Sequence, residues 1–115
     1  PLSPWVRDSD TQWVDIVKWT VHAVVTAEEL GITSKNVDRF SASKDPQVRR
    51  LLGLDAGIGK SFGLGDKWAY NVIKAVGNYG EIWDRNVGLK TPLKLERGQN
   101  ALWNKGGLHY ALPVR

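Results

Sequence analysis

Apolar residues recur at helical spacing over a long stretch near the start of the chain. Between residues 10 and 30 the polar side chains form one narrow stripe at three- and four-residue steps, made of Asp15, Lys18, His22, Thr26 and Glu29. Most other positions are apolar, so such a helix needs burial over most of its circumference. Asp8, Ser9 and Asp10 offer N-cap oxygens, and Gly31 offers a stop. The pattern predicts a central helix over residues 10–30.

A second apolar period lies in the middle of the chain. Its apolar residues also follow helical steps, at Trp68, Ala69, Val72, Ile73 and Val76. We expect Asp66 to cap this helix and Gly77 to end it in a left-handed conformation, which Asn78 also tolerates. The spacing resumes at Tyr79 and stops at Gly88. The pattern therefore predicts a helix, a glycine turn and a second, shorter helix.

The first half of the chain carries shorter signals. Residues 1–9 are expected to form an extended leading segment, because two prolines disfavour a helix there. Residues 34–40 can form a short helix. Asp45 and Pro46 make a cap and first-turn pair that starts another helix, which ends at Gly53. The glycine-rich residues 53–65 are predicted to form a loop.

Residues 31–115 are thus predicted to consist of short helices and loops. A final helical turn is expected over residues 99–105, followed by an extended tail over residues 108–113. Little of the sequence is typical of a strand. The predicted fold is mainly α, with residues 1–115 forming a single helical domain.

Composition agrees with a globular protein. The chain has 115 residues, 42% of them hydrophobic and 24% charged, which is enough for one domain with its own core. No run approaches the ~20 apolar residues that a membrane span needs. Cysteine is absent from the sequence, which removes disulfides and thiolate metal sites.

The net charge of +4 raises the question of whether the chain binds nucleic acid. Residues 59–115 carry 9 basic and 4 acidic side chains, but the basic ones are scattered singly. Nucleic-acid readers usually show a basic cluster or stripe with interleaved aromatic residues. A solvated surface is the better interpretation, and a basic nucleic-acid-binding domain remains the weaker alternative.

Candidate chemistry is sparse. Gly59, Lys60 and Ser61 resemble the end of a phosphate-binding loop, but the required earlier glycine is Leu54, and a helical pattern precedes the segment in place of a strand. The histidines at positions 22 and 109 have no second ligand at metal spacing. We predict no metal, no cofactor and no catalytic residue, and no ligand-binding residue is assigned.

Two carboxylates lie three residues apart in the second half of the chain. Glu81 and Asp84 could be called a catalytic pair, but Arg85 lies one turn from Glu81 and favours an exposed ion pair. No serine, threonine or lysine is placed as an activated nucleophile. The protein is predicted not to be an enzyme.

The chain contains 6 tryptophans, a high count for its length. Trp13, Trp19, Trp68 and Trp83 sit in apolar helical patterns, which favours core packing. Trp5 and Trp103 lack such a setting and are candidates for contact with another chain. The face of the first helix that carries Trp13, Val17 and Val24 is a second candidate interface.

Long sequence segments carry a family resemblance. Residues 76–88 read VGNYGEIWDRNVG, and further matching segments are AEELGITS at 27–34, VRRLLG at 48–53 and GGL at 106–108. These resemble the C-terminal region of periplasmic amino-acid-binding proteins that feed ABC importers, a type II solute-binding protein family. The general L-amino-acid-binding branch is the most similar. The chain departs from the family at Ser3, where glycine is favoured, and at Trp5, where a small residue is usual.

The resemblance implies a role within a larger protein. Such proteins have two α/β lobes, and the matched positions follow the last crossover between them. The groups that hold the ligand come mainly from earlier segments, so this chain would be a C-terminal fragment that supports a ligand-binding lobe in the periplasm. The parent would bind an L-amino acid and an ABC permease.

Two partners are then possible for the apolar first helix. In the complete protein the remainder of the binding protein would cover it, whereas in the isolated chain a second copy is expected to do so. Exposing a large apolar patch is uncommon in a monomer, so a homo-oligomer is predicted. The alternative function is a free-standing helical module that binds another protein.

Overall fold

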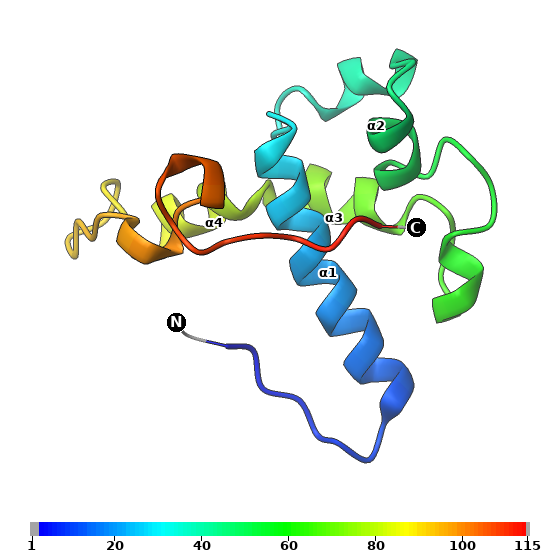
Figure 1. Ribbon diagram of the computed structural model, residues 1–115, viewed down its shortest axis with the longest axis horizontal. Coiled ribbons are helices and arrows are strands. Elements are labelled where there is room, and N and C mark those ends of the chain that lie inside the picture. The colour runs from blue at the N-terminus through cyan, green and yellow to red at the C-terminus, as the bar shows by residue number, and fades with distance from the viewer. Residues whose placement is uncertain (1–2, 115) are drawn as a thin grey trace.

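The computed structural model describes residues 3–114, which form helices connected by loops (Figure 1). The α-helices are α1 (Thr11–Glu29), α2 (Pro46–Leu51), α3 (Trp68–Val76) and α4 (Tyr79–Asn86). Short 3-10 helices occupy Val37–Ala42, Gly59–Phe62, Gly98–Asn100 and Trp103–Lys105. Residues 3–114 contain no strand, and an isolated bridge pairs Leu102 with His109. The prediction of a mainly α fold is confirmed.

Helix α1 crosses the molecule, and the other helices gather around its C-terminal half (Figure 1). Asp10 caps it as expected, since its carboxylate accepts a hydrogen bond from the backbone N–H of Trp13 at 2.9 Å. The buried residues of α1 all lie in the second half of the helix, at Ala23, Val24, Val25 and Ala27. Burial over most of the circumference is therefore found only there, because the other helices do not surround the first turns. No helix of the described chain combines the length and the apolar character needed to cross a membrane.

The core lies between α1, α2 and α3. Its fully buried side chains come from the segment after α1, from the end of α2 and from α3. They include Ile32, Val37, Leu51, Leu52 and Ile73. A smaller apolar cluster joins Val25 of α1 to Leu102 and Ala111, with Tyr79 packed against it. This second cluster connects the C-terminal segment to α1 and to the start of α4.

The glycine-rich loop is closed by Asp66, which was expected to cap α3. Asp45 caps α2 as predicted, but Asp66 does not cap α3. Its carboxylate instead accepts hydrogen bonds from the backbone N–H groups of Gly57 at 3.0 Å and Gly59 at 3.3 Å. The loop also passes so close to Gly53 that a Cβ there would meet the carbonyl oxygen of Asp66 at 1.9 Å. Because the Asp66 carboxylate closes this loop, it is not available to cap the N-terminus of α3.

The corner between α3 and α4 also differs from expectation. Gly77 has a positive φ of 83° but a ψ of −171°, so it does not adopt the expected left-handed helical cap. Asn78 is extended, with φ −80°, and is not left-handed. Asn78 is the N-cap of a capping box with Glu81: the Asn78 side chain accepts from the Glu81 N–H at 3.0 Å, and the Glu81 carboxylate accepts from the Asn78 N–H at 2.8 Å. The extended backbone places the side chain where it can satisfy the first turn of α4.

The same two side chains bind the segment that follows α1. The buried Asn78 amide donates to the carbonyl oxygen of Ile32 at 2.8 Å, and the hydroxyl of Ser34 donates to the Glu81 carboxylate at 2.7 Å. We call these contacts among Ile32, Ser34, Asn78 and Glu81 the α1–α4 joint. The expected exposed pair of Glu81 with Arg85 is therefore wrong, because Arg85 donates to the Val76 carbonyl at 3.1 Å.

Electrostatics in the joint follow from these bonds. Burial by itself would raise the pKa of Glu81, but hydrogen bonds from Ser34 and Asn78 outweigh it and lower the pKa. The carboxylate is thus held in its charged form. Its contribution to stability is present above the ordinary carboxylate range and is lost as the pH falls through the lowered pKa.

Replacing Asn78 by alanine should weaken the whole fold. The variant loses the cap of α4 and leaves the Ile32 carbonyl without its partner, so the free energy of unfolding should fall by about 1–3 kcal/mol. Urea unfolding followed by circular dichroism measures this. Asn104→Ala, at an exposed position, is the matched control and should be within about 0.5 kcal/mol of the parent. Equal stability of the two variants would contradict the importance of the joint.

Candidate functional site

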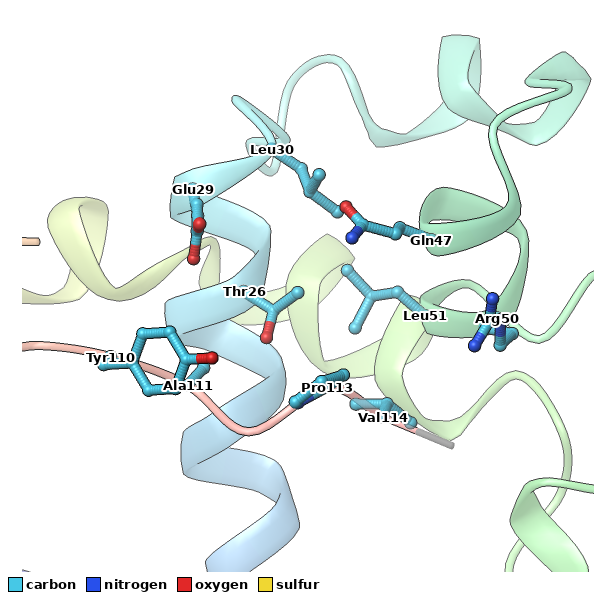
Figure 2. Close-up of a pocket in the computed structure, with 10 residues that line it drawn as sticks. All are labelled: Thr26, Glu29, Leu30, Gln47, Arg50, Leu51, Tyr110, Ala111, Pro113 and Val114. Atoms are coloured by element: carbon cyan, nitrogen blue, oxygen red, sulfur yellow. The ribbon is translucent and has the colours of Figure 1, made fainter. Parts of the chain in front are cut away.

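A groove of about 510 Å³ lies between the second half of α1, α2 and the C-terminal tail (Figure 2). Its walls are formed by Thr26, Glu29, Leu30, Gln47, Arg50, Leu51, Tyr110, Ala111, Pro113 and Val114. The tail supplies one complete wall, and α1 and α2 supply the opposite ones.

The polar groups of the groove do not form a ligand clamp. The hydroxyl of Thr26 donates to the carbonyl oxygen of His22 within its own helix, at 2.8 Å. Glu29 and Arg50 are exposed and belong to different helices. Within residues 3–114 no cluster of histidine, cysteine or carboxylate side chains is arranged to hold a metal ion. The groove can accept an apolar side chain or a chain segment, but it does not fix a charged group in one orientation.

A partly buried ion pair lies on the other side of α1. Arg97 pairs with Glu28 of α1 through two hydrogen bonds, at 2.9 and 3.0 Å, and the side chains are 23% and 11% exposed. The same guanidinium donates to the carbonyl oxygen of Asn100 at 2.9 Å. Both fork positions of the arginine are used, which gives the pair a defined geometry. We call this arrangement the Arg97 cluster.

Aromatic rings surround the Arg97 cluster. The guanidinium lies 5.3 Å from the ring centre of Tyr79 and 6.0 Å from that of Trp83. The His109 ring packs edge-on against Tyr79, with ring centres 4.4 Å apart. Burial lowers the pKa of His109, and the nearby positive charge of Arg97 lowers it further, while Glu28 opposes the shift. The arrangement holds segments together and offers no activated nucleophile or general base.

The predicted interface residues are distributed over separate places. Trp5 is 95% exposed, Trp13 is 51% exposed and Trp103 is 52% exposed. Val17 is half-buried, one turn after Trp13 on α1. Val24 is only 5% exposed and packs inside its own chain, so it is not part of the open surface. Trp103 lies beside Tyr110, with ring centres 6.2 Å apart.

Sequence reasoning did not find the Arg97 cluster. Glu28 and Arg97 are 69 positions apart, and Arg97 stands among other scattered basic residues. Neither residue lies at a spacing that marks an ion pair. Their contact depends on the return of the chain after α4, for which the sequence gives no local signal.

Comparison with known proteins gives a consistent result. No family model matches the chain. The general L-amino acid-binding periplasmic protein AapJ of Rhizobium johnstonii is 57% identical over 117 residues, which cover 100% of this chain and 34% of that protein. The glutamate/glutamine/aspartate/asparagine-binding protein BztA of Rhodobacter capsulatus is 49% identical over 116 residues, again covering 100% of this chain and 34% of that protein.

The chain matches the C-terminal third of periplasmic amino-acid-binding proteins of ABC transporters. A solved structure agrees: a periplasmic binding protein of an ABC transporter from Brucella ovis, with glutathione bound, superposes with a TM-score of 0.91 at 52% identity. The match covers 96% of this chain and 35% of that one. The resemblance seen in the sequence is confirmed, and the chain spans about a third of the length of these relatives.

The Arg97 cluster should stabilise the fold more than an exposed ion pair does. A double-mutant cycle with Arg97→Ala and Glu28→Ala should give a coupling energy of about 1–3 kcal/mol, because the pair is bidentate and partly screened from water. The exposed pair of Arg49 with Asp55, treated identically, should give less than about 0.5 kcal/mol. Urea unfolding of both sets checks this, and equal couplings would contradict the expectation.

Proposed function

We propose that this chain is the C-terminal segment of an amino-acid-binding component of an ABC importer and supports a ligand-binding lobe. The observation that carries the proposal is the match of the entire chain to a third of each relative, at 49–57% identity. In this proposal the complete protein works in the periplasm, captures its ligand by closure of two lobes and delivers it to a permease. It is a binding protein and not an enzyme.

The ligand class follows from the relatives. AapJ and BztA are named for L-amino acids, and the Brucella ovis protein carries glutathione. All these ligands share a free α-amino and α-carboxylate group, which glutathione presents at its glutamyl end. We infer that the complete protein binds a compound with this group, through residues that precede the present chain.

The support role rests on how the segment is built. The α1–α4 joint and the Arg97 cluster both fix the second half of α1. The 3-10 helix Gly59–Phe62 contacts one side of the first half, where Gln12 donates to the carbonyl oxygen of Phe62 at 3.0 Å, and the rest of the first half is open. Trp13 and the half-buried Val17 lie on that open half, and Trp5 is exposed in the segment before it. We propose that residues 1–115 act as one helical unit whose open half of α1 packs against the remainder of the binding protein.

A free-standing interaction module is the second candidate. The exposed ring pair of Trp103 and Tyr110 favours it, because exposed aromatic residues are frequent anchors at protein interfaces. This surface lies near the C-terminal tail, apart from the open half of α1. The two candidates differ in which of these surfaces is covered by the partner.

The isolated chain should bind no free amino acid. The groove lacks converging charged groups, and in this proposal the ligand-clamping residues precede the chain. Calorimetry against the twenty amino acids and glutathione should show no heat of binding above the dilution control. Micromolar binding of any of them would overturn the support role, because the chain would then contain a ligand site.

The isolated chain should also self-associate through the open half of α1. Sedimentation at micromolar concentration is expected to show a homo-oligomer, because a second copy covers the exposed apolar face. Trp13→Glu should shift the distribution to the 12.8 kDa monomer. Trp103→Glu is the matched control and should leave the oligomer intact, whereas the reverse pattern would favour the free-standing module.

A further inference from the structure

The C-terminal tail, residues 108–114, crosses α1 as an extended segment (Figure 1). The start of the tail is held by backbone hydrogen bonds to residues 99–101. The N–H of Leu108 donates to the Gln99 carbonyl at 2.8 Å, and the N–H of His109 donates to the Ala101 carbonyl at 3.0 Å. Further along, the N–H of Leu112 donates to Nδ1 of His22 at 3.3 Å. In the described chain this is the hydrogen bond that attaches residues 110–114 to α1.

The bond at Leu112 requires a neutral His22. An imidazole accepts a hydrogen bond only at its unprotonated nitrogen, whereas the imidazolium carries N–H on both nitrogens and accepts none. Protonation of His22 would therefore replace the hydrogen bond by two N–H groups that point at each other, those of Leu112 and of Nδ1. Lys18 lies one turn earlier on the same helix and disfavours a second positive charge, and the Trp19 ring packs 5.4 Å away. Residues 110–114 carry no acidic side chain that could stabilise a positive charge on His22.

His109 places the same constraint on the start of the tail. Its Nδ1 atom is buried and has no hydrogen-bond partner among the described residues. Arg97 faces the ring from one side, and the Glu28 carboxylate that could compensate is already held by both fork positions of Arg97. A protonated ring would thus bring an additional buried donor and a positive charge beside a guanidinium.

We propose that the tail is an acid-released strap: protonation of His22, together with that of His109 at the start of the tail, detaches residues 110–114 from α1 and removes one wall of the groove, while residues 108 and 109 stay held by their backbone hydrogen bonds. His22 lies beneath the tail and accepts its hydrogen bond, and His109 lies at the start of the tail, where its ring packs against Tyr79. Release would also uncover Ala111 and Val114, which are buried in the two apolar clusters. The groove bounded by Thr26 and Leu51 would then open toward solvent.

The direction of the pH dependence follows from the pKa values. Burial first, and then a neighbouring positive charge, lowers the pKa of each histidine below the ordinary 6.5. Release of the tail reduces the burial of both rings and frees that of His109 to turn away from Arg97, whereas Lys18 stays beside His22. The state with the detached tail therefore binds protons more readily than the state with the attached tail. Attachment is strongest above pH 6.5, and it weakens as the pH falls below that value toward the lowered pKa values.

Amide hydrogen exchange on the full chain tests the strap. Protection factors, which correct for the intrinsic pH dependence of exchange, would be compared at about pH 7.5 and pH 5.0. The Leu112 amide should lose protection by about tenfold or more, because its acceptor, Nδ1 of His22, is lost on protonation. The Ile73 amide in α3 should change by less than about threefold. A parallel loss at Ile73 would mean global unfolding and would overturn the proposal.

Non-titrating variants complete the test. His22→Asn keeps an acceptor near the position of Nδ1, and His109→Phe keeps the ring against Tyr79, so the double variant should hold the Leu112 amide protected at both pH values. Each single variant should show an intermediate loss and provides the same information if the double variant does not fold. An undiminished loss in the folded variants, or a constant protection factor in the parent, would overturn the strap.

Discussion

The hydrogen bond from the buried Asn78 amide to the carbonyl oxygen of Ile32 constrains the rest of the molecule. It joins the segment that follows α1 to the residue that caps α4. A buried polar side chain is costly unless its partners are in place, so the two segments cannot separate independently. Because Gly77 directly precedes Asn78, the same contact also fixes where α3 ends. The positions of α3 and α4 relative to α1 thus depend on one corner.

The Arg97 cluster extends this constraint to the C-terminal part of the chain. Once α4 is fixed, Tyr79 and Trp83 present their rings to Arg97, and its guanidinium reaches Glu28 on α1. The segment that continues from Arg97 then brings His109 against Tyr79 and directs the tail across α1. The groove is a consequence of this path, because the tail forms its wall.

The sequence was sufficient for the four α-helices. It was insufficient for the 3-10 helix Gly59–Phe62, which lies in a predicted loop, and for the contacts between helices. Periodicity located α1 and α3, and Asp10 and Asp45 were recognised as caps because capping is a local interaction. Asp66 satisfies the criteria for a cap equally well, yet its carboxylate closes a loop nine positions away. Local patterns state what a side chain can do. They do not state which distant backbone group will compete for it.

The polar stripe of the first helix shows the same limit more clearly. A row of polar side chains on a helix usually marks the face that water covers. Here His22 accepts a hydrogen bond from the tail, and Thr26 and Glu29 line the groove. At His22 the stripe meets a backbone segment that has no strand or helix to satisfy its N–H groups. By contrast, Asp15, Lys18 and Glu29 are exposed as expected. Periodicity identifies the stripe, but it cannot show that another part of the chain lies across it.

Helix α1 therefore has an unusual division of its surface. The tail crosses its polar stripe at His22, whereas Trp13 in its first turn is half exposed. An apolar face needs a permanent partner, since uncovering it costs free energy at every pH. A polar contact that needs neutral histidines can be broken when they are protonated. The apolar surface that this exposes is that of Ala111 and Val114. The open half of α1 is thus suited to fixed attachment within a larger protein, and the tail contact at His22 is suited to a response to acid.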